Sequence, residues 1–469
     1  MAVFLRALTL LTLTAIITIS WIIVTKQRYN LLPKYVYYQM SNMTTTKGTG
    51  SNRIIETAQP FTSFVQDAET CPNLSNVYNV SEIYLAFDNW HTVIDDLLYV
   101  YSAHVDPRHK DNSIIRIIGI ISRHQLETTS PVYYCQMYFD GSENVSVIES
   151  VIYTIGEHRK PKFRMIELAC NVSRDPWSLP PMLVSITTQT CAEPNNHLAV
   201  RQSYKNGFKT NFTLCLDGVL KHGTTKSSLI VEWIELNMLL GAEHIFVYNL
   251  SGSALLDPYL NYYERKGQLT ILPWNIPIQF NEDLDEFGHD FHLVWNYAQT
   301  TAQNDCLYRN LFVARHLAYL DFDEFIIPQE VDVWNWNDMM EHAKHNCTNR
   351  PGSYVARNAF FLTNEINDSN VDEFNLTTAL HTTMNDRLKK PGFRSKHILI
   401  PEHVRHVNIH YVEEYYDKSY STCVVLPSVG HLHHYREFTK KGSKHTNLSA
   451  LKYKPYLIRQ IHHVYDEIK

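Results

Sequence analysis

The chain has 469 residues, a hydrophobic fraction of 44% and a formal net charge of −6 at pH 7. A chain of this length can form two or three domains, each with a core of its own. The mild negative charge gives no basic footprint, so the composition argues against a protein that binds nucleic acid.

The amino-terminal region predicts a membrane anchor. Residues 7–25 carry no charge and are rich in Leu, Ile, Thr and Ala. As a helix they are just long enough to cross a bilayer. We therefore expect a cytoplasmic tail over residues 1–6, a transmembrane signal anchor over 7–25 and a stem over 26–70. A cleaved signal peptide is the alternative, because Thr18 and Ser20 form a weak small-x-small cleavage site.

The cysteines and glycosylation sequons all follow this segment. The eight cysteines are widely spaced and include no Cys-x-x-Cys pair, and Asn-x-Ser/Thr sequons recur from Asn42 to Asn447. An even set of such cysteines favours disulfides in an oxidising lumen over buried free thiols. The sequons also indicate a lumenal chain. We expect a single-pass type II protein of the Golgi membrane whose large domain is lumenal.

Short strands dominate the first part of the lumenal chain. Residues 82–87, 113–121 and 147–153 are rich in β-branched side chains and are separated by turn residues. This pattern predicts strands. We expect a β-rich, sandwich-like module over residues 71–205.

Strands and helices alternate from about residue 211. The pattern is typical of an α/β fold with a parallel sheet. We predict a mostly parallel, Rossmann-like α/β domain over residues 206–469, in which ligands bind at the carboxyl ends of the strands. The expected elements are strands over 212–216, 244–249, 268–274 and 314–320, and helices over 227–240, 255–265 and 291–312.

Two aspartates follow the last of these strands. In an extended chain, Asp321 and Asp323 point the same way, whereas Glu324 points to the opposite face. Paired carboxylates suit a hard divalent cation. An isolated Asp-x-Asp also occurs at helix caps and in solvated turns. The position at a strand end favours a catalytic metal site, with Asp321 and Asp323 as ligands and Glu324 in either a catalytic or a structural role.

Other side chains extend this candidate site. His410 ends a strand-like run and is a further candidate metal ligand, with a satisfied core histidine as the alternative. Arg394 and Lys396 are candidates for binding a donor diphosphate, because anionic phosphates need fixed cations. The sequence does not identify the general base that would deprotonate an acceptor hydroxyl. The candidates are Glu324, Asp290 and Glu365.

A set of motifs follows in a fixed order over roughly residues 211–436. The motifs are Glu232-Trp233-Ile234-Glu235, Leu240-Gly241-Ala242-Glu243-His244-Ile245-Phe246-Val247-Tyr248, Gln303-Asn304-Asp305-Cys306-Leu307-Tyr308-Arg309, Leu320-Asp321-Phe322-Asp323-Glu324-Phe325-Ile326-Ile327-Pro328, Arg394-Ser395-Lys396-His397-Ile398-Leu399-Ile400-Pro401, Asn408-Ile409-His410-Tyr411 and His434-Tyr435-Arg436. This ordered set resembles the glycosyltransferase family 92 domain. Phe322 departs from the isoleucine that the family often has between its aspartates.

The resemblance implies a GT-A-type fold and an inverting, manganese-dependent galactosyltransferase. The implied donor is UDP-galactose, and the implied acceptor is a glycan or glycoprotein. Two alternatives remain open at this point: a membrane-anchored, lectin-like protein that binds glycans without turnover, and a relative that has lost catalysis.

Overall fold

The structure is a computed structural model that describes residues 69–72, 74, 88–109, 112–140, 142, 144–156, 160–173, 180–202, 207–221, 227–251, 256–278, 293–347, 350–437 and 443–469. Within these ranges, no helix is long and apolar enough to cross a membrane. The expected tail and anchor, nearly all of the stem, and the expected strand over 82–87 lie outside the described residues.

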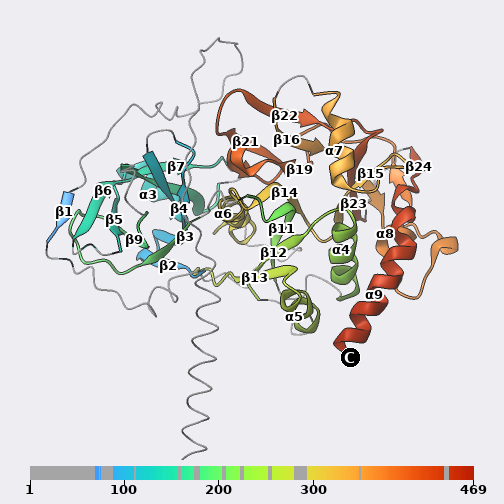
Figure 1. The fold of residues 1–469 in the computed structure, drawn as a ribbon, viewed down its shortest axis with the longest axis horizontal. Helices are drawn as coiled ribbons and strands as arrows, with labels where there is room; N and C mark the ends of the chain where they lie inside the picture. The colour runs from blue at the N-terminus through green and yellow to red at the C-terminus, as the bar shows by residue number, and fades with distance from the viewer. Residues whose placement is uncertain are drawn as a thin grey trace, which may run out of the picture. The chain divides into compact units, whose positions relative to one another are not determined.

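A curled ten-stranded sheet forms the first part of the described chain (Figure 1). Its order is β1-β6-β5-β9-β10-β3-β4-β8-β7, with β2 paired to β3. A disulfide joins Cys135 of β5 to Cys170 of β8, which are far apart in this order, and one core contains residues from both halves. The sheet therefore curls over on itself. The elements are β1 Glu69–Cys71, β2 His91–Ile94, β3 Leu98–Asp106, β4 Asn112–Ser122, α3 Arg123–Thr129, β5 Tyr134–Tyr138, β6 Val145–Glu149, β7 Val151–Thr154, β8 Phe163–Ser173, β9 Leu183–Thr187 and β10 Leu198–Arg201.

One expected strand of this sheet is split in two. The pattern over 147–153 predicts a single strand, but β6 ends at Glu149 and β7 begins at Val151. Ser150 is buried between them, and its hydroxyl donates to the carbonyl of Tyr133 over 2.9 Å. Because β6 pairs with β5 while β7 pairs with β8, the chain turns a corner of the curled sheet here.

A seven-stranded sheet follows, in the order β13-β12-β11-β14-β19-β16-β22. The first four strands are mutually parallel, and β19 is antiparallel to both of its neighbours. The chain fills β11, β12 and β13 on one side and then returns to β14 on the other side of β11. The mixed α/β expectation is confirmed. The strands are β11 Thr210–Leu220, β12 His244–Asn249, β13 Leu269–Pro273, β14 Ala314–Leu320, β16 Arg350–Ala356, β19 Lys396–Leu399 and β22 Tyr420–Val424.

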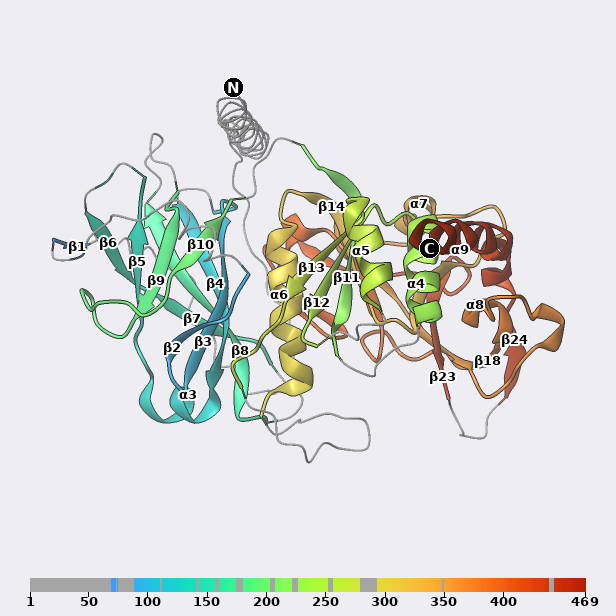
Figure 2. The ribbon, with the colours of Figure 1, turned by 90° about the horizontal axis from the view of Figure 1, so that it is seen from below.

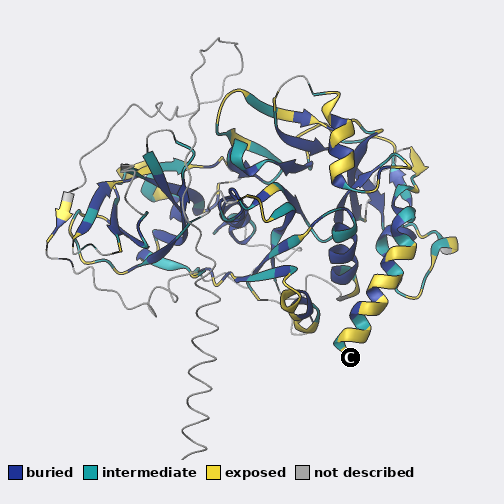
Figure 3. Cartoon of the chain, in the orientation of Figure 1, coloured by how far each residue is buried: buried dark blue, intermediate teal, exposed yellow. Residues whose placement is uncertain are grey.

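Helices cover both faces of this sheet (Figure 2). Phe212 and Leu214 of β11 share a core with helices α4 and α9, whereas Cys215 shares a core with α6. Alternation of side chains along β11 explains this division. Helix α9 buries Leu457, Ile461 and Val464 and exposes its opposite face (Figure 3). The helices are α4 Ser227–Leu239, α5 Asp257–Arg265, η1 Trp295–Ala298, α6 Gln299–Arg309, α7 Trp336–Lys344, η2 Asp368–Asn370, α8 Thr377–Leu380, η3 Pro401–His403, η4 Ser449–Tyr453 and α9 Lys454–Ile468.

The helix expected over 291–312 is shorter than predicted. Helix α6 begins at Gln299, after three residues with positive φ from Asn296 to Ala298. Helix α4, in contrast, ends as expected before Gly241, whose φ of 118° is the left-handed conformation of a terminating glycine.

A five-stranded sheet and a hairpin complete the fold. The five-stranded sheet has the order β15-β23-β17-β18-β24, and β15 follows β14 after three residues, Asp321 to Asp323. The Asp-x-Asp segment therefore lies at the junction of two sheets. The remaining strands are β15 Glu324–Pro328, β17 Asn358–Leu362, β18 Thr383–Asn385, β20 Val404–Asn408, β21 Tyr411–Tyr415, β23 Gly430–Arg436 and β24 Lys444–Thr446.

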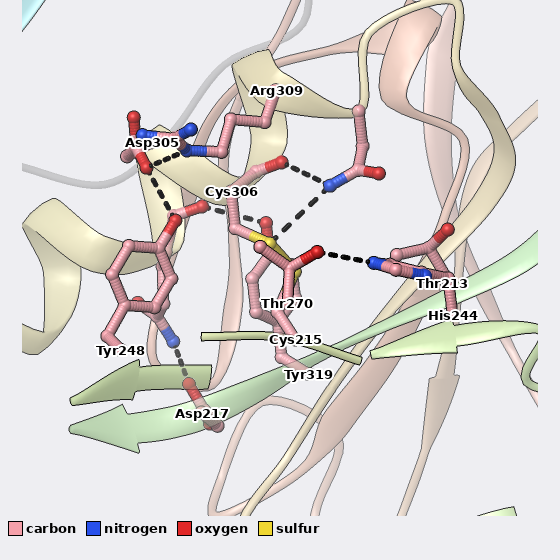
Figure 4. The surroundings of a disulfide bond; sticks show 12 residues. Thr213, Cys215, Asp217, His244, Tyr248, Thr270, Asp305, Cys306, Arg309 and Tyr319 are labelled. Carbon is pink, nitrogen blue, oxygen red and sulfur yellow. Dashed lines mark hydrogen bonds and ion pairs between the residues drawn. A yellow bond between two sulfur atoms is a disulfide. The ribbon is translucent and has the colours of Figure 1, made fainter. Parts of the chain in front are cut away.

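All eight cysteines form disulfides, which confirms the expected disulfide framework. Cys215–Cys306 connects β11 to α6, and Figure 4 shows this disulfide at the centre of the picture, below Arg309. This bond holds the helix against the strand that leads into the candidate site. The other pairs are Cys71–Cys191, Cys135–Cys170 and Cys347–Cys423.

Candidate active site

Two acids lie at neighbouring positions of the adjacent parallel strands β11 and β14: Asp217 within β11 and Asp321 just after β14. The register pairs Cys215 with Tyr319 and Leu216 with Leu320, so the next positions are Asp217 and Asp321. The strand order reverses between β11 and β14. Ligands of open α/β sheets bind at such a point, beyond the carboxyl ends of the strands.

Lys396, at the start of β19, joins these acids. Its Nζ forms an ion pair with Asp217 and lies 2.8 Å from Asp321 Oδ2 and 3.0 Å from Glu324 Oε2. The lysine side chain is only 1% exposed. Burial alone would lower the pKa of Lys396, but the three carboxylates outweigh it and raise the pKa well above its ordinary value. Lys396 is therefore protonated and contacts all three carboxylates.

The Asp-x-Asp segment is a turn and not an extended strand. The Glu324 amide donates to the carbonyl of Asp321 over 3.0 Å, which folds Glu324 back toward Lys396. The expectation that Glu324 points away from Asp321 is therefore wrong, because side-chain alternation does not hold in a turn. Phe322 packs edge-on against buried Trp233, with ring centroids 5.0 Å apart, and so anchors the turn in the core.

His434 extends the cluster to the second aspartate. Its Nδ1 lies 3.1 Å from Glu324 Oε1, and its Nε2 lies 3.3 Å from Asp323 Oδ2. Burial opposes protonation, but the carboxylates of Glu324 and Asp323 raise the pKa of His434 to about 9. Lys396 and then His434 hold the pKa of Glu324 far below its ordinary value despite burial. Two cations thus fix Glu324 as an ionised structural group.

The cluster carries more acids than bases. Four carboxylates face one lysine and one histidine. Burial and then the neighbouring Glu324 and Asp217 carboxylates raise the pKa of Asp321 to about 8 against the effect of Lys396. Solvent weakens this rise, since 39% of the Asp321 side chain is exposed. A cation bound near Asp321 would relieve the repulsion.

Only Asp321 and Asp323 present this excess charge to solvent. Their side chains are 39% and 41% exposed, whereas those of Asp217 and Glu324 are 0% and 2% exposed. Two open carboxylates fit a hard divalent cation that completes its shell with water and substrate phosphates. Among the described residues, no group of three or more His, Cys, Asp or Glu side chains is arranged to hold a metal ion by itself.

His410 lies at the turn between β20 and β21, beside the cluster. Its carbonyl accepts a hydrogen bond from His397 Nε2 over 2.8 Å. Burial, followed by the positive charges of Lys396 and Arg394, lowers the pKa of His410 to about 4, so its imidazole is neutral. Its Nδ1 is buried and has no hydrogen-bond partner among the described residues. A neutral nitrogen of this kind is a suitable metal ligand, and the assignment stays a prediction.

Comparison with known proteins identifies the family. The family model "Glycosyltransferase family 92" matches residues 210–468, more than half of the chain. The chain belongs to glycosyltransferase family 92. Every residue of the cluster lies inside the matched region.

Two relatives from Caenorhabditis elegans share part of this family 92 chain. A protein named beta-1,4-galactosyltransferase galt-1 is 26% identical over 247 residues, which cover 50% of this chain and 52% of the relative. A protein named glycosyltransferase family 92 protein F13G3.3 is 32% identical over 89 residues, which cover 19% of this chain and 18% of the relative. The chain thus spans about half the length of the first relative and under a fifth of the second.

The family 92 site includes residues that the sequence analysis did not select. Asp217 lies inside β11, one residue beyond the last residue that pairs with β14, and an acid after the apolar residues Leu214 to Leu216 is the signal that marks it. In the sequence His434 is visible only as part of the motif His434-Tyr435-Arg436, and its contacts with Glu324 and Asp323 depend on the pairing of β15 with β23. Of the candidate bases, Glu324 is held by Lys396 and His434, Glu365 forms an ion pair with Lys444, and Asp290 lies outside the described residues.

Proposed function

We propose that the protein is a metal-dependent, inverting glycosyltransferase that transfers galactose from UDP-galactose to a glycoprotein glycan. The observation that carries the proposal is the open pair Asp321 and Asp323, which presents excess negative charge where the strand order reverses. Membership of family 92 implies a nucleotide-sugar donor and a glycan acceptor. The strand arrangement supports a GT-A-type domain.

The donor assignment rests on the relative. The printed name of the 26% identical nematode protein, beta-1,4-galactosyltransferase, supports galactose as the transferred sugar. The disulfides support a lumenal location. We therefore extend the proposal to a single-pass type II protein of the Golgi membrane, anchored through residues 7–25.

Asp321 and Asp323 are the proposed ligands of a divalent cation, with Mn²⁺ as the expected metal. His410 is the third proposed ligand, and it has to move toward the two aspartates when the cation binds, because the three side chains do not form a ligand group in the described structure. Such a cation, when bound, neutralises charge that develops on the leaving diphosphate. Lys396 contacts Asp217, Glu324 and one oxygen of Asp321, and His434 contacts Glu324 and one oxygen of Asp323, while the Asp321 and Asp323 side chains stay partly exposed to solvent. The protein thus fixes the two ligands before the donor arrives, so that little reorganisation is needed during transfer.

Transfer by a purified lumenal fragment, residues 69–469, tests the proposal. With Mn²⁺ and UDP-galactose, we expect galactose transfer to a glycan acceptor and loss of transfer on chelation. Replacing Asp323 by Ala removes an exposed ligand without opening the core. We expect a loss of about 100-fold or more in turnover with an unchanged thermal unfolding midpoint.

Asp332→Ala is the matched control, because Asp332 is an exposed aspartate a few residues further along the chain. Its activity should equal that of the wild type. Activity of Asp323→Ala within a few-fold of the control would show that the Asp-x-Asp turn is structural. Glycan binding without any transfer or donor hydrolysis would favour the lectin-like alternative.

A further inference from the structure

A second charged feature adjoins the carboxylates: two arginines share one aromatic ring. The guanidinium carbons of Arg394 and Arg436 lie 5.8 and 5.9 Å from the ring centroid of Phe360. Arg394 precedes β19, Arg436 ends β23 and Phe360 lies in β17. Lys389 Nζ lies 5.2 Å from the same centroid. Segments that are distant in sequence therefore bring three positive charges to this ring, two of them arginines.

Neither arginine has an ion-pair partner among the described residues. No described carboxylate lies within ion-pair distance of Arg394 or Arg436, and both side chains are partly open to solvent. Burial and then the neighbouring charge of Arg436 lower the pKa of Arg394, and the Glu324 and Asp323 carboxylates act in the opposite direction. Two like charges at close range repel each other, and a bound anion would remove this cost.

The backbone of Arg394 supports the same conclusion. Its φ of 51° is in the left-handed region, which is uncommon for a residue other than glycine. Such a conformation costs free energy and is enriched at functional sites, where the surrounding structure holds it. Here the guanidinium of this residue lies over the Phe360 ring.

The arginine pair lies next to the open aspartates. Arg436 and His434 are two residues apart on β23 and so share a face. His434 contacts the Phe360 ring, with centroids 5.3 Å apart, and lies 3.3 Å from Asp323. The Tyr435 amide also donates to the carbonyl of Asp323 over 2.8 Å. One ligand can therefore reach both the arginines and a cation held by Asp321 and Asp323.

We propose that Arg394 and Arg436 together bind the diphosphate of the donor, and that Lys396 does not contact it. The inference rests on the proposed function and makes it more specific. A diphosphate supplies negative charge to pair with the two arginines, and its oxygens are ligands that a divalent cation prefers. A guanidinium group binds phosphate through two parallel N–H donors. Lys396 is buried, and its Nζ is already surrounded by Asp217, Asp321 and Glu324.

Isothermal titration of the lumenal fragment with Mn²⁺ present tests this assignment. The probes are UDP and, separately, inorganic pyrophosphate. We expect Arg394→Gln and Arg436→Gln each to weaken both probes by about tenfold or more, since each removes charged hydrogen bonds to phosphate. Arg436→Lys should retain part of the affinity, because it keeps the charge and loses the paired donors. Lys390→Gln is the matched control: an exposed lysine of the same loop, whose loss should leave both affinities unchanged.

The outcomes separate this inference from the proposed function. If the glutamine variants bind both probes as the control does, the arginine assignment is overturned while a UDP-dependent reaction stands. If the wild type binds pyrophosphate through the arginines but does not bind UDP, the anion site stands and the nucleotide donor is wrong. If folded wild-type protein binds neither probe, both proposals fail.

Discussion

At the scale of the residue, Lys396 shows how a lysine is retained in a protein interior. A buried ammonium is costly unless it is paired and hydrogen-bonded. Here Asp217, Asp321 and Glu324 supply the pairs. Gln303 also donates to Asp217, so that both oxygens of this carboxylate are occupied. The positive charge of Lys396 thus reduces the electrostatic repulsion between the three carboxylates.

Replacing Lys396 by Met should destabilise the protein. The substitution leaves the buried Asp217 and Glu324 without their common counter-ion, and breaking such a pair typically costs about 3–5 kcal/mol. We expect a large fall in the thermal unfolding midpoint, or little secreted protein. The double variant Lys396→Met with Asp217→Asn should recover part of the loss, since it removes one uncompensated charge.

Lys390→Met is the control for that comparison, because Lys390 is exposed and lies in the same region of the chain. An unchanged midpoint for Lys396→Met would mean that the carboxylates are neutral in the folded protein. The ion-pair description of the site would then be wrong.

The sequence revealed the Asp-x-Asp segment but only part of its surroundings. Asp321 and Asp323 stand out because an apolar strand precedes them and another follows. Asp217 lies next to Asp321 only because of the register between β11 and β14. Arg436 belongs to the site only because three segments of the chain meet at Phe360. No local pattern encodes such tertiary contacts. The orientation of Glu324 was predicted wrongly because a strand rule was applied to a turn.

At the scale of the element, the hairpin of β20 and β21 carries His410 and is fastened at its base. Arg108, which follows β3, donates to the carbonyls of Pro401 and Val404 over 3.1 and 2.6 Å. Asn304 of α6 exchanges two hydrogen bonds with the Val407 backbone, at 3.0 and 2.9 Å. The curled sheet and α6 therefore both fix the position of the turn at His410.

Replacing Arg108 by Leu should loosen this hairpin. The loss of charged hydrogen bonds to buried carbonyls is expected to lower its local opening free energy by about 2 kcal/mol or more, which is about 30-fold faster amide exchange. Hydrogen–deuterium exchange measured by mass spectrometry over residues 401–416 would detect the change. Arg265→Leu, an exposed arginine of α5, is the control and should leave the hairpin protected. Equal protection in both variants would contradict the proposed fastening role.

Local sequence patterns predicted the first and last residues of some elements correctly and those of other elements wrongly. Strands β12 and β14 have the bounds expected from their apolar runs, His244–Asn249 and Ala314–Leu320. Both are central parallel strands, which read as continuous apolar segments. The helix expected from residue 291 fails because positive-φ residues precede α6. The strand expected over 147–153 breaks because its halves pair with different partners.

At the scale of the whole described chain, buried charges connect the curled sheet with the α/β part. Glu167 of β8 lies 2.8 Å from His406 Nε2, and His104 of β3 lies 2.9 Å from Asp305 Oδ1. Asp305 also accepts from Tyr248 and lies 2.5 Å from Arg309, as Figure 4 shows for these three residues. His104 and Glu167 keep these partners across the two parts only while both parts are present.

His406 should make stability depend on pH. Burial lowers the pKa of His406, but Glu167 and then Glu414 outweigh it, with Arg405 opposing, so the pKa is raised above its ordinary value of 6.5. The folded state then binds the proton more tightly than the unfolded state. Its stabilisation is complete below the ordinary value and is lost as the pH rises through the folded pKa. We expect the unfolding midpoint to fall as the pH rises above 6.5, the ordinary pKa of the imidazole.

His406→Gln should flatten that profile, whereas His342→Gln should preserve it. His342 forms an ion pair with Glu330 at the surface, where the two side chains are 47% and 40% exposed, and such pairs contribute little. Thermal unfolding of the three proteins across this range is the measurement. An equally steep fall in the His406→Gln protein would assign the pH dependence to other groups.

The α/β part should not fold without the curled sheet. A fragment of residues 208–469 would expose Asp305 and Tyr308, which are fully buried in the described chain, and would remove Tyr99, Tyr101 and Phe163 from the core that α6 shares. The exposed apolar surface and the unpaired polar groups should both lower the stability of the fragment, because water contacts groups that are buried in the intact protein. We expect the fragment to be retained or to aggregate when expressed for secretion, whereas residues 69–469 should unfold cooperatively. Circular dichroism and UDP titration of both fragments would decide the matter. A soluble 208–469 fragment that unfolds cooperatively and binds UDP like the longer one would show that the family 92 region is self-sufficient and that the curled sheet serves another purpose.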